Sequence, residues 1–195
     1  MRDALGKIKG FSIREFVAWY GPERDGEHVR VVIRGLDAND HAHFDLADAA
    51  LGILPSSWYP AEVIHRVLDG ILRGLSPHEI DALAQAGGAA TVRSMMKGLY
   101  RTVFSLVMSP RRYGRAVQLT WKLNYDSGWF ENIEMAPKKH QGVVHEWAGH
   151  HPFLCRMNVA AKAAIYEVMD CERVVVERSC KSDGGTWCGS VITWE

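Results

Sequence analysis

The four cysteines of this chain all lie in its last stretch, at Cys155, Cys171, Cys180 and Cys188. In the same stretch, three consecutive valines begin the segment 174–180, turn-forming residues fill 181–185, and the segment 186–194 follows. This order predicts a β-hairpin at the end of the chain. Thiolates close to the turn of a hairpin, together with a cysteine on an upstream helix, have the chemistry to surround one tetrahedral zinc ion. The rest of the chain is then expected to build a pocket beside this hairpin.

The chain has 195 residues, which is enough for one domain, 1–195, with a sizeable core. Its 23 basic and 23 acidic residues cancel, which gives no reason to expect nucleic acid or an acidic membrane as a partner. Neither a leader pattern nor an apolar run of about eighteen residues is present, so we expect a cytoplasmic protein. Cysteines are reduced in that compartment, which favours metal ligation or simple packing over disulfides.

Helical spacing of apolar residues dominates the first half of the chain. We expect a short edge strand at 7–11, a polar loop at 37–45, and helices at 12–21, 28–36, 61–73 and 77–86. Ser76 and Glu79 form a capping box at the start of the last of these helices. The longest helical pattern, 89–108, has one broad apolar side and predicts a central, largely buried helix.

The second half begins with a change of period. Apolar residues alternate over 116–125, which predicts a strand, and turn residues at 126–128 lead into a partner strand at 129–135. From 139 to 170 we expect two helices with a break at His150-His151-Pro152, because proline disfavours helix in the residue before it. The order helices, hairpin, helices, hairpin indicates an α+β fold with helices packed on an antiparallel sheet.

The most specific chemical pattern is Cys155, then Glu177-x-x-Cys180, then Cys188. Thiolates are soft ligands that suit zinc, and a carboxylate oxygen can complete the tetrahedron. The alternative is that the cysteines are small buried apolar residues. In a regular strand, Glu177 and Cys180 point to opposite faces, so a site that uses both requires the strand to bulge or end between them.

This pattern, with a His-Pro-rich segment before Cys155, resembles the vinyl-reductase-type (4VR) ligand-binding domain. That domain is the sensor module of aromatic-responsive bacterial transcription activators, and it is related to heme-nitric-oxide-binding and Golgi-transport domains. The resemblance implies a structural zinc beside a small-molecule pocket. It assigns the zinc ligands to Cys155, Glu177, Cys180 and Cys188, and it leaves Cys171 without a role.

A second resemblance covers nearly the whole chain. Short motifs are similar to an uncharacterised family of paralogues that is abundant in myxobacteria, whose members are similar to the same ligand-binding superfamily. The motifs are at 7–10, 57–60, Gly98-Leu99, 109–112 and 191–194. No biochemical activity is implied by that family, so this resemblance supports the fold rather than a function.

A cluster of histidines invites a metalloprotease interpretation, which the spacing excludes. The zinc-protease motif requires two histidines four residues apart on one helical face. His145 and His150 are five residues apart, or roughly 140° around a helix. With His140 and His151 they are better explained as a surface or interface cluster, able to bind metal weakly or to titrate near neutral pH.

Heme is the other cofactor that the superfamily raises. Heme needs an axial ligand, commonly histidine, facing an apolar cavity, and the segment 89–108 contains no histidine. Tyr113-Gly114-Arg115 also lacks the Tyr-x-Ser-x-Arg spacing of the heme-nitric-oxide family, so we do not expect heme. Aromatic side chains instead have the size to line a pocket for a small hydrophobic or aromatic ligand, or simply to fill the core. The residues that we assign to the pocket are Tyr100, Phe104, Trp121 and Trp129.

The sequence contains no nucleophile elbow, phosphate-binding glycine loop or dinucleotide fingerprint, so we do not expect an enzyme. We predict a non-enzymatic small-molecule sensor that acts as a homodimer. Its zinc would be structural, since four protein ligands leave no position open for chemistry. The alternatives are a dimeric scaffold or protein-interaction module whose pocket has closed, and an enzyme that uses the histidine cluster.

Overall fold

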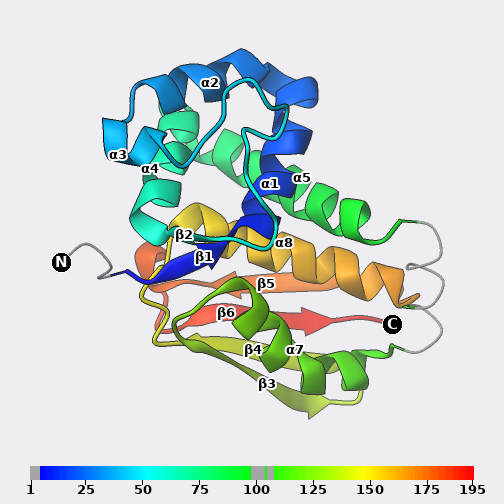
Figure 1. Cartoon of the computed structure of the whole chain (residues 1–195). Helices are drawn as coiled ribbons and strands as arrows, with labels where there is room; N and C mark the ends of the chain where they lie inside the picture. Colours follow the sequence, from blue (N-terminus) through cyan, green and yellow to red (C-terminus); the bar gives the residue numbers. More distant parts are fainter. Residues whose placement is uncertain (1–4, 98–103, 105–107) are drawn as a thin grey trace.

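Helices from the first half of the chain stack above a long helix, α8, which lies on a four-stranded sheet (Figure 1). The computed structural model describes residues 5–97, 104 and 108–195. The first elements are β1 (Lys7–Lys9), α1 (Gly10–Tyr20), the π-helical turn η1 (Gly21–Asp25), α2 (Gly26–Arg34), α3 (Ala38–His41), β2 (Trp58–Pro60) and α4 (Ala61–Leu72). The later elements are α5 (Pro77–Met95), α7 (Pro110–Asn124), β3 (Trp129–Ala136), β4 (Lys139–His145), α8 (Pro152–Val168), β5 (Val175–Ser179), the 3-10 helix η2 (Lys181–Asp183) and β6 (Cys188–Thr193). The predicted α+β class is confirmed.

The strands of the large sheet are antiparallel and lie in the order β3-β4-β6-β5. β5 and β6 form the predicted C-terminal hairpin, with Val176 opposite Ile192. β6 also pairs with β4, so the last strand of the chain lies inside the sheet. β1 and β2 form a separate pair of short strands. Because β6 is paired on both sides, its first residue, Cys188, has a fixed position at the end of the hairpin turn.

The segment 116–125, predicted as a strand, is instead the second half of the helix α7. A serine cap followed by proline at the first helical position starts this helix. Val117 and Trp121, four residues apart, are buried, whereas Leu119 and Leu123 are exposed. The prediction was wrong because alternate apolar residues also include a pair at helical spacing, and packing against β3 selects that pair.

The segment 139–145, predicted as a helix, is the strand β4. It pairs with β3 on one side and with β6 on the other. Two neighbouring strands therefore supply the backbone hydrogen bonds of this segment, and neither is visible in its own periodicity. The helix predicted after His150-His151-Pro152 is confirmed as α8.

The helix α5 continues through Gly87 and Gly88, where its end was predicted. A Cβ atom at residue 88 would lie 2.5 Å from the Met157 carbonyl oxygen on α8, so glycine lets these two helices approach closely. The predicted helix 89–108 is the end of α5 as far as Met95, and most of its remainder lies outside the described residues. The polar loop predicted at 37–45 contains the short helix α3.

Two groups of buried apolar side chains join the layers. The first lies among the N-terminal helices and the start of α8, and it includes Phe16, Ile64 and Phe153. The second lies between α7, α8 and the sheet, and it includes Tyr166 and Ile192. Because α8 contributes to both groups, it connects the helical half of the chain to the sheet.

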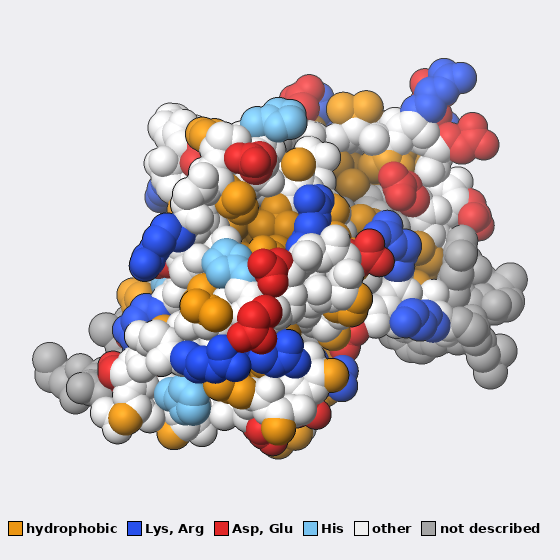
Figure 2. All heavy atoms as spheres, turned by 90° about the horizontal axis from the view of Figure 1, so that it is seen from above, with side chains coloured by type: hydrophobic (Ala, Val, Ile, Leu, Met, Phe, Trp, Pro, Cys, Tyr) orange, Lys and Arg blue, Asp and Glu red, His pale blue; other side chains and the backbone are white. Residues whose placement is uncertain are grey.

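The surface of the molecule carries charges of both signs. Seen from above, Lys, Arg, Asp and Glu side chains are intermixed, and apolar side chains show between them near the centre of the view (Figure 2). This distribution agrees with a formal net charge of zero. Among the described helices, none is long and apolar enough to cross a membrane.

One charged side chain is buried between α8 and the sheet. Lys162 is 6% exposed, and its Nζ donates to Ser190 Oγ over 3.4 Å and lies 5.1 Å from the Phe130 ring centroid. A Cβ atom at residue 142 of β4 would collide with both Lys162 Nζ and the Phe130 ring, so glycine is needed there. In the described part of the chain, no carboxylate pairs with Lys162. Burial lowers the pKa of Lys162 to about 8.

This burial predicts a pH-dependent stability. The pKa of Lys162 is about 8 in the folded chain and 10.5 for an ordinary lysine. The unfolded chain therefore binds more protons between these values, and the free energy of unfolding should rise with pH across the window, by roughly 3 kcal/mol. Urea unfolding of wild type and Lys162→Met over this pH range measures the effect. The stability difference between them should change with pH, and a constant difference would mean that Lys162 is not desolvated.

Candidate metal centre

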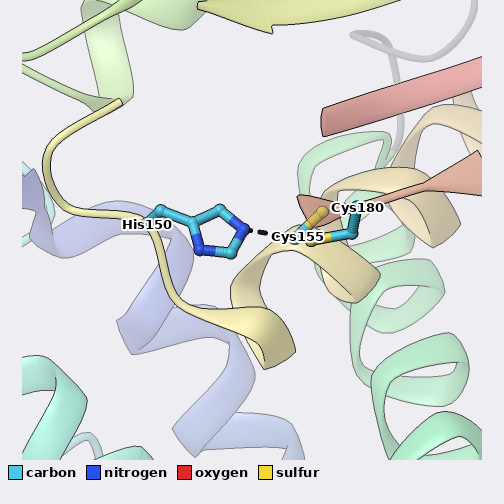
Figure 3. Close-up of side chains that lie close together, drawn as sticks. All are labelled: His150, Cys155 and Cys180. Atoms are coloured by element: carbon cyan, nitrogen blue, oxygen red, sulfur yellow. Dashed lines mark hydrogen bonds between the residues drawn. The ribbon is translucent and has the colours of Figure 1, made fainter. Parts of the chain in front are cut away.

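Three cysteines and one histidine converge where α8 meets the turn of the C-terminal hairpin. Cys155 lies in the first turn of α8, Cys180 follows the end of β5, and Cys188 begins β6. His150 lies in the loop that precedes α8 and points toward Cys155 and Cys180 (Figure 3). The four side chains therefore come from a loop, a helix and both ends of one hairpin turn.

The distances between their ligand atoms suit a tetrahedral metal ion. His150 Nε2 lies 3.2 Å from Cys180 Sγ and 3.9 Å from Cys188 Sγ, and the two sulfurs are 3.8 Å apart. The ligand atoms of His150, Cys155 and Cys180 all lie within 4.8 Å of one another. Around a tetrahedral zinc with Zn–S bonds of about 2.3 Å, two sulfurs are about 3.8 Å apart. His150, Cys155 and Cys180 therefore lie at zinc spacing, and Cys188 lies at that spacing from His150 and Cys180.

The turn between Cys180 and Cys188 is built by its own backbone. The helix η2 begins directly after Cys180, and Gly184 closes it in the left-handed conformation with φ of 83°. The Gly185 N–H donates to the Cys180 carbonyl over 2.9 Å, and the Lys181 N–H donates to Cys188 Sγ over 3.4 Å. These bonds hold the two sulfurs on the same side of the turn, facing α8.

The thiol of Cys155 is costly to ionise without a cation nearby. Burial, followed by the neighbouring Cys180, raises the pKa of Cys155 to about 12. A metal ligand must be a thiolate, so a bound cation would have to supply the missing stabilisation. For Cys180, burial acts to raise the pKa, but hydrogen bonds from Ser182 and neighbouring thiols outweigh it and lower the pKa.

Arg178 provides a positive charge beside these thiols. Its guanidinium hydrogen-bonds to Cys155 and pairs with Asp183, which also lies 3.2 Å from Arg156 Nη2 on α8. The Nη1 atom of Arg178 is buried, and no described residue accepts a hydrogen bond from it. This orphaned donor therefore fits a site that holds thiolates rather than thiols.

The structure brings together three of the four zinc ligands expected from the sequence. Cys155, Cys180 and Cys188 lie beside His150, whereas Glu177 is exposed on β5. β5 ends at Ser179 without a bulge, so Glu177 and Cys180 face different directions. His150 was expected to lie with His140, His145 and His151 in a surface or interface cluster, although it is two residues before the helix that carries Cys155. Cys171 lies beyond the other end of α8, with its Sγ 4.0 Å from the Met169 carbonyl oxygen.

The aromatic residues assigned to a pocket occupy different environments. Trp121 is buried, with its ring centroid 5.0 Å from that of Trp147. Trp129 is on the surface and stacks on His145 with centroids 3.9 Å apart. Phe104 is partly buried against the second core, and Tyr100 lies outside the described residues. Trp121 and Trp129 therefore lie in different surroundings, and a pocket formed by the four residues stays a prediction.

Two neighbouring hollows reach the metal centre from the surface. The first, of about 460 Å³, is lined by Trp147, Lys181, His150 and Cys188, among others. The second, of about 380 Å³, is lined by Trp129, Trp187 and again Cys188. Both are within the size range of small-molecule sites. The His150–Cys188 edge of the cluster therefore faces the hollows, while Cys155 and Cys180 are buried.

The fold has relatives of known structure, but sequence comparison finds none. No protein-family model matches the chain, and no curated protein matches it. The Fe(II) unliganded H-NOX protein from K. algicida has a TM-score of 0.66 at 12% identity, covering 96% of this chain and 97% of that one. The H-NOX protein from S. oneidensis in the Fe(II)NO state also has a TM-score of 0.66, at 10% identity, covering 96% and 99%. The fold expected from the heme-nitric-oxide-binding resemblance is thus confirmed, while the resemblance to 4VR domains and to the myxobacterial family stays a prediction.

A further structure of the same fold, with a TM-score of 0.62 at 8% identity, is named for its heme redox potential. The residues of this chain do not fit a heme held by a histidine. The sequence has no histidine between His78 and His140. His140 is buried with Nδ1 2.7 Å from the Tyr166 hydroxyl, and His151 Nε2 lies 3.1 Å from Asp69. His150 belongs to the thiol cluster, so we derive no role for heme.

The geometry predicts that His150, and not Glu177, is the fourth zinc ligand. His150→Ala is expected to weaken zinc affinity by more than about tenfold, since even outer-shell partners contribute 10–100-fold. Glu177→Ala, on the exposed side of the same hairpin, is the matched control and should bind zinc like wild type. Competition with a chromophoric chelator measures both. Normal affinity in His150→Ala together with loss in Glu177→Ala would restore the ligand set expected from the resemblance.

Proposed function

We propose that this protein is a non-enzymatic, small-molecule-binding sensor module whose C-terminal hairpin is fixed to α8 by a structural zinc ion. The observation that carries the proposal is the cluster of His150, Cys155 and Cys180 at zinc spacing, with Cys188 close to His150 and Cys180. Four protein ligands leave no open coordination position, which is the arrangement of structural zinc sites. The metal would then stabilise the fold and would not take part in a reaction.

The small-molecule site that we propose is the pair of hollows beside the metal centre. Trp129, Trp147 and Trp187 line them, and tryptophan supplies large apolar surfaces for a hydrophobic or aromatic ring. Lys181 stands at the rim of both hollows. A ligand there would touch the His150–Cys188 edge, so its binding would be coupled directly to the metal centre.

The sensor role draws support from the fold. The similar structures are H-NOX proteins in an Fe(II) unliganded and an Fe(II)NO state, and the second name describes a protein with a bound small ligand. Because the histidines here do not fit a heme, the sensor that we propose acts without one. A reducing compartment such as the cytoplasm would keep the three thiols available for zinc.

Ligand binding by the zinc-loaded chain tests this function. The probe is 2-naphthol, a neutral two-ring aromatic, and the signals are quenching of tryptophan fluorescence and the shift in melting temperature. We expect saturable binding to wild type and at least about tenfold weaker binding to Trp187→Ala, which loses a wall of one hollow. Trp58→Ala, at an exposed tryptophan on β2, is the control and should bind like wild type.

The results separate the two parts of the proposal. Absence of binding by zinc-loaded wild type would reject the ligand site and leave the structural zinc intact. A folded wild-type chain that contains no zinc and does not take it up would reject the metal. Added hemin should keep the broad Soret absorption of free hemin in either case, and a sharp, shifted Soret band would contradict a heme-independent sensor.

The second candidate function is a dimeric protein-interaction module with a closed pocket. Two observations favour it. Trp121, one of the expected pocket residues, is packed into the core with Tyr125 and Trp147. In the part of the chain that the structure describes, one face of the large sheet also has no helix on it and carries apolar side chains.

A further inference from the structure

The helices α7 and α8 cover only one face of the four-stranded sheet. Both helices contact sheet residues whose side chains point to the same face, which we call the inner face. On that inner face Phe130 packs against Trp121 of α7, and His140 contacts Tyr166 of α8. The register of the strands places the intervening residues on the opposite side. We call that side the outer sheet face; in the described part of the chain, no helix packs on it (Figure 1).

The outer sheet face is more apolar than a solvated sheet face should be. Along its strands the apolar residues are Trp129, Ile133, Val143, Val175 and Val191. Trp129 and Ile133 are each 40% exposed, and Val175 is 55% exposed. An antiparallel sheet with one face in water normally alternates apolar inside with polar outside. A contiguous apolar surface of this kind marks an interaction site.

The charges on the outer sheet face indicate what kind of partner fits. Glu131 is paired with His145 at 3.0 Å. Lys139 and Glu177 lie on the same face, and neither forms an ion pair with a described residue. A strongly acidic partner would repel Glu177, and a strongly basic partner would repel Lys139. A surface that itself carries one unpaired lysine and one unpaired glutamate can satisfy both.

We infer that the outer sheet face binds the same face of a second copy of this chain, through two-fold sheet-on-sheet packing. In such an interface Lys139 of each copy faces the partner's Glu177. An isologous contact is made twice, so both charges of both copies are paired. Sheets that pack face to face interdigitate apolar side chains across about 10 Å, which suits the valine, isoleucine and tryptophan side chains here. The formal net charge of zero means that two copies do not repel each other.

The inference also gives Glu177 a place in the structure. This residue is exposed on β5 and lies away from the thiols. It sits opposite Val191 in the outer sheet face. Glu177 would then form an ion pair between the two copies. This interface rests on the candidate second function. It contains none of the metal ligands, but Trp129 and Val143 also line one of the two hollows, so a dimer would cover part of that hollow.

The mass of the protein in solution tests the interface. Light scattering after size-exclusion chromatography, over a micromolar concentration series, should show a dimer for wild type. Ile133→Glu places a charge among the apolar side chains of the interface and should raise the dimer dissociation constant at least about 100-fold. The matched control is Leu123→Glu, at an exposed leucine of α7 outside this face, which should remain dimeric.

Three outcomes would overturn the inference: a monomeric wild type, a dimeric Ile133→Glu, or a Leu123→Glu that dissociates as readily as Ile133→Glu. Circular dichroism and zinc content of Ile133→Glu show that the variant is folded. If it proves unfolded, Glu177→Lys replaces it, since this exposed side chain has no packing role and should weaken the dimer by reversing one charge. Unchanged 2-naphthol binding by a monomeric variant would show that the sensor function does not depend on the dimer.

Discussion

The convergence of His150, Cys155, Cys180 and Cys188 is the interaction on which the arrangement of the second half of the chain depends. It ties the loop before α8 to α8 itself and to both ends of the hairpin turn. Because β6 lies inside the sheet, a fixed turn also fixes the register of its neighbours. Burial raises the pKa of the Cys155 thiol, so this cluster is stable as thiolates only with a cation, and Arg178 supplies just one positive charge.

The effect of the cluster extends beyond the sheet through α8. This helix packs against α5 so closely that residue 88 must be glycine, and its other side presses Lys162 into the space left by Gly142. The region between α7, α8 and the sheet is filled by side chains such as Tyr113, Tyr166 and Ile192. Among the described residues, His140 and His150 are engaged with Tyr166 and with the thiol cluster. The surface beside the metal centre and the outer sheet face are both open.

Local patterns predicted the elements whose signals are local. The capping box at Ser76, the start of α8 after Pro152 and the terminal hairpin were all visible in the sequence, and the cysteine spacing pointed to the centre. The errors arise where distant neighbours decide. Alternation over 116–125 fits a strand and a helix equally, and β4 acquires its conformation from strands on both sides. The position of His150 depends on a loop conformation that residue spacing does not encode. By contrast, strand geometry alone predicts that Glu177 and Cys180 point to opposite faces of a regular strand.

We propose that three thiolates and one imidazole hold one zinc ion. X-ray absorption at the zinc edge, on untagged protein purified without added metal, measures this ligand set. We expect about one zinc per chain with three sulfur ligands at about 2.3 Å and one nitrogen at about 2.0–2.1 Å. An absence of zinc from folded protein, or a shell with two or fewer sulfurs, would contradict it.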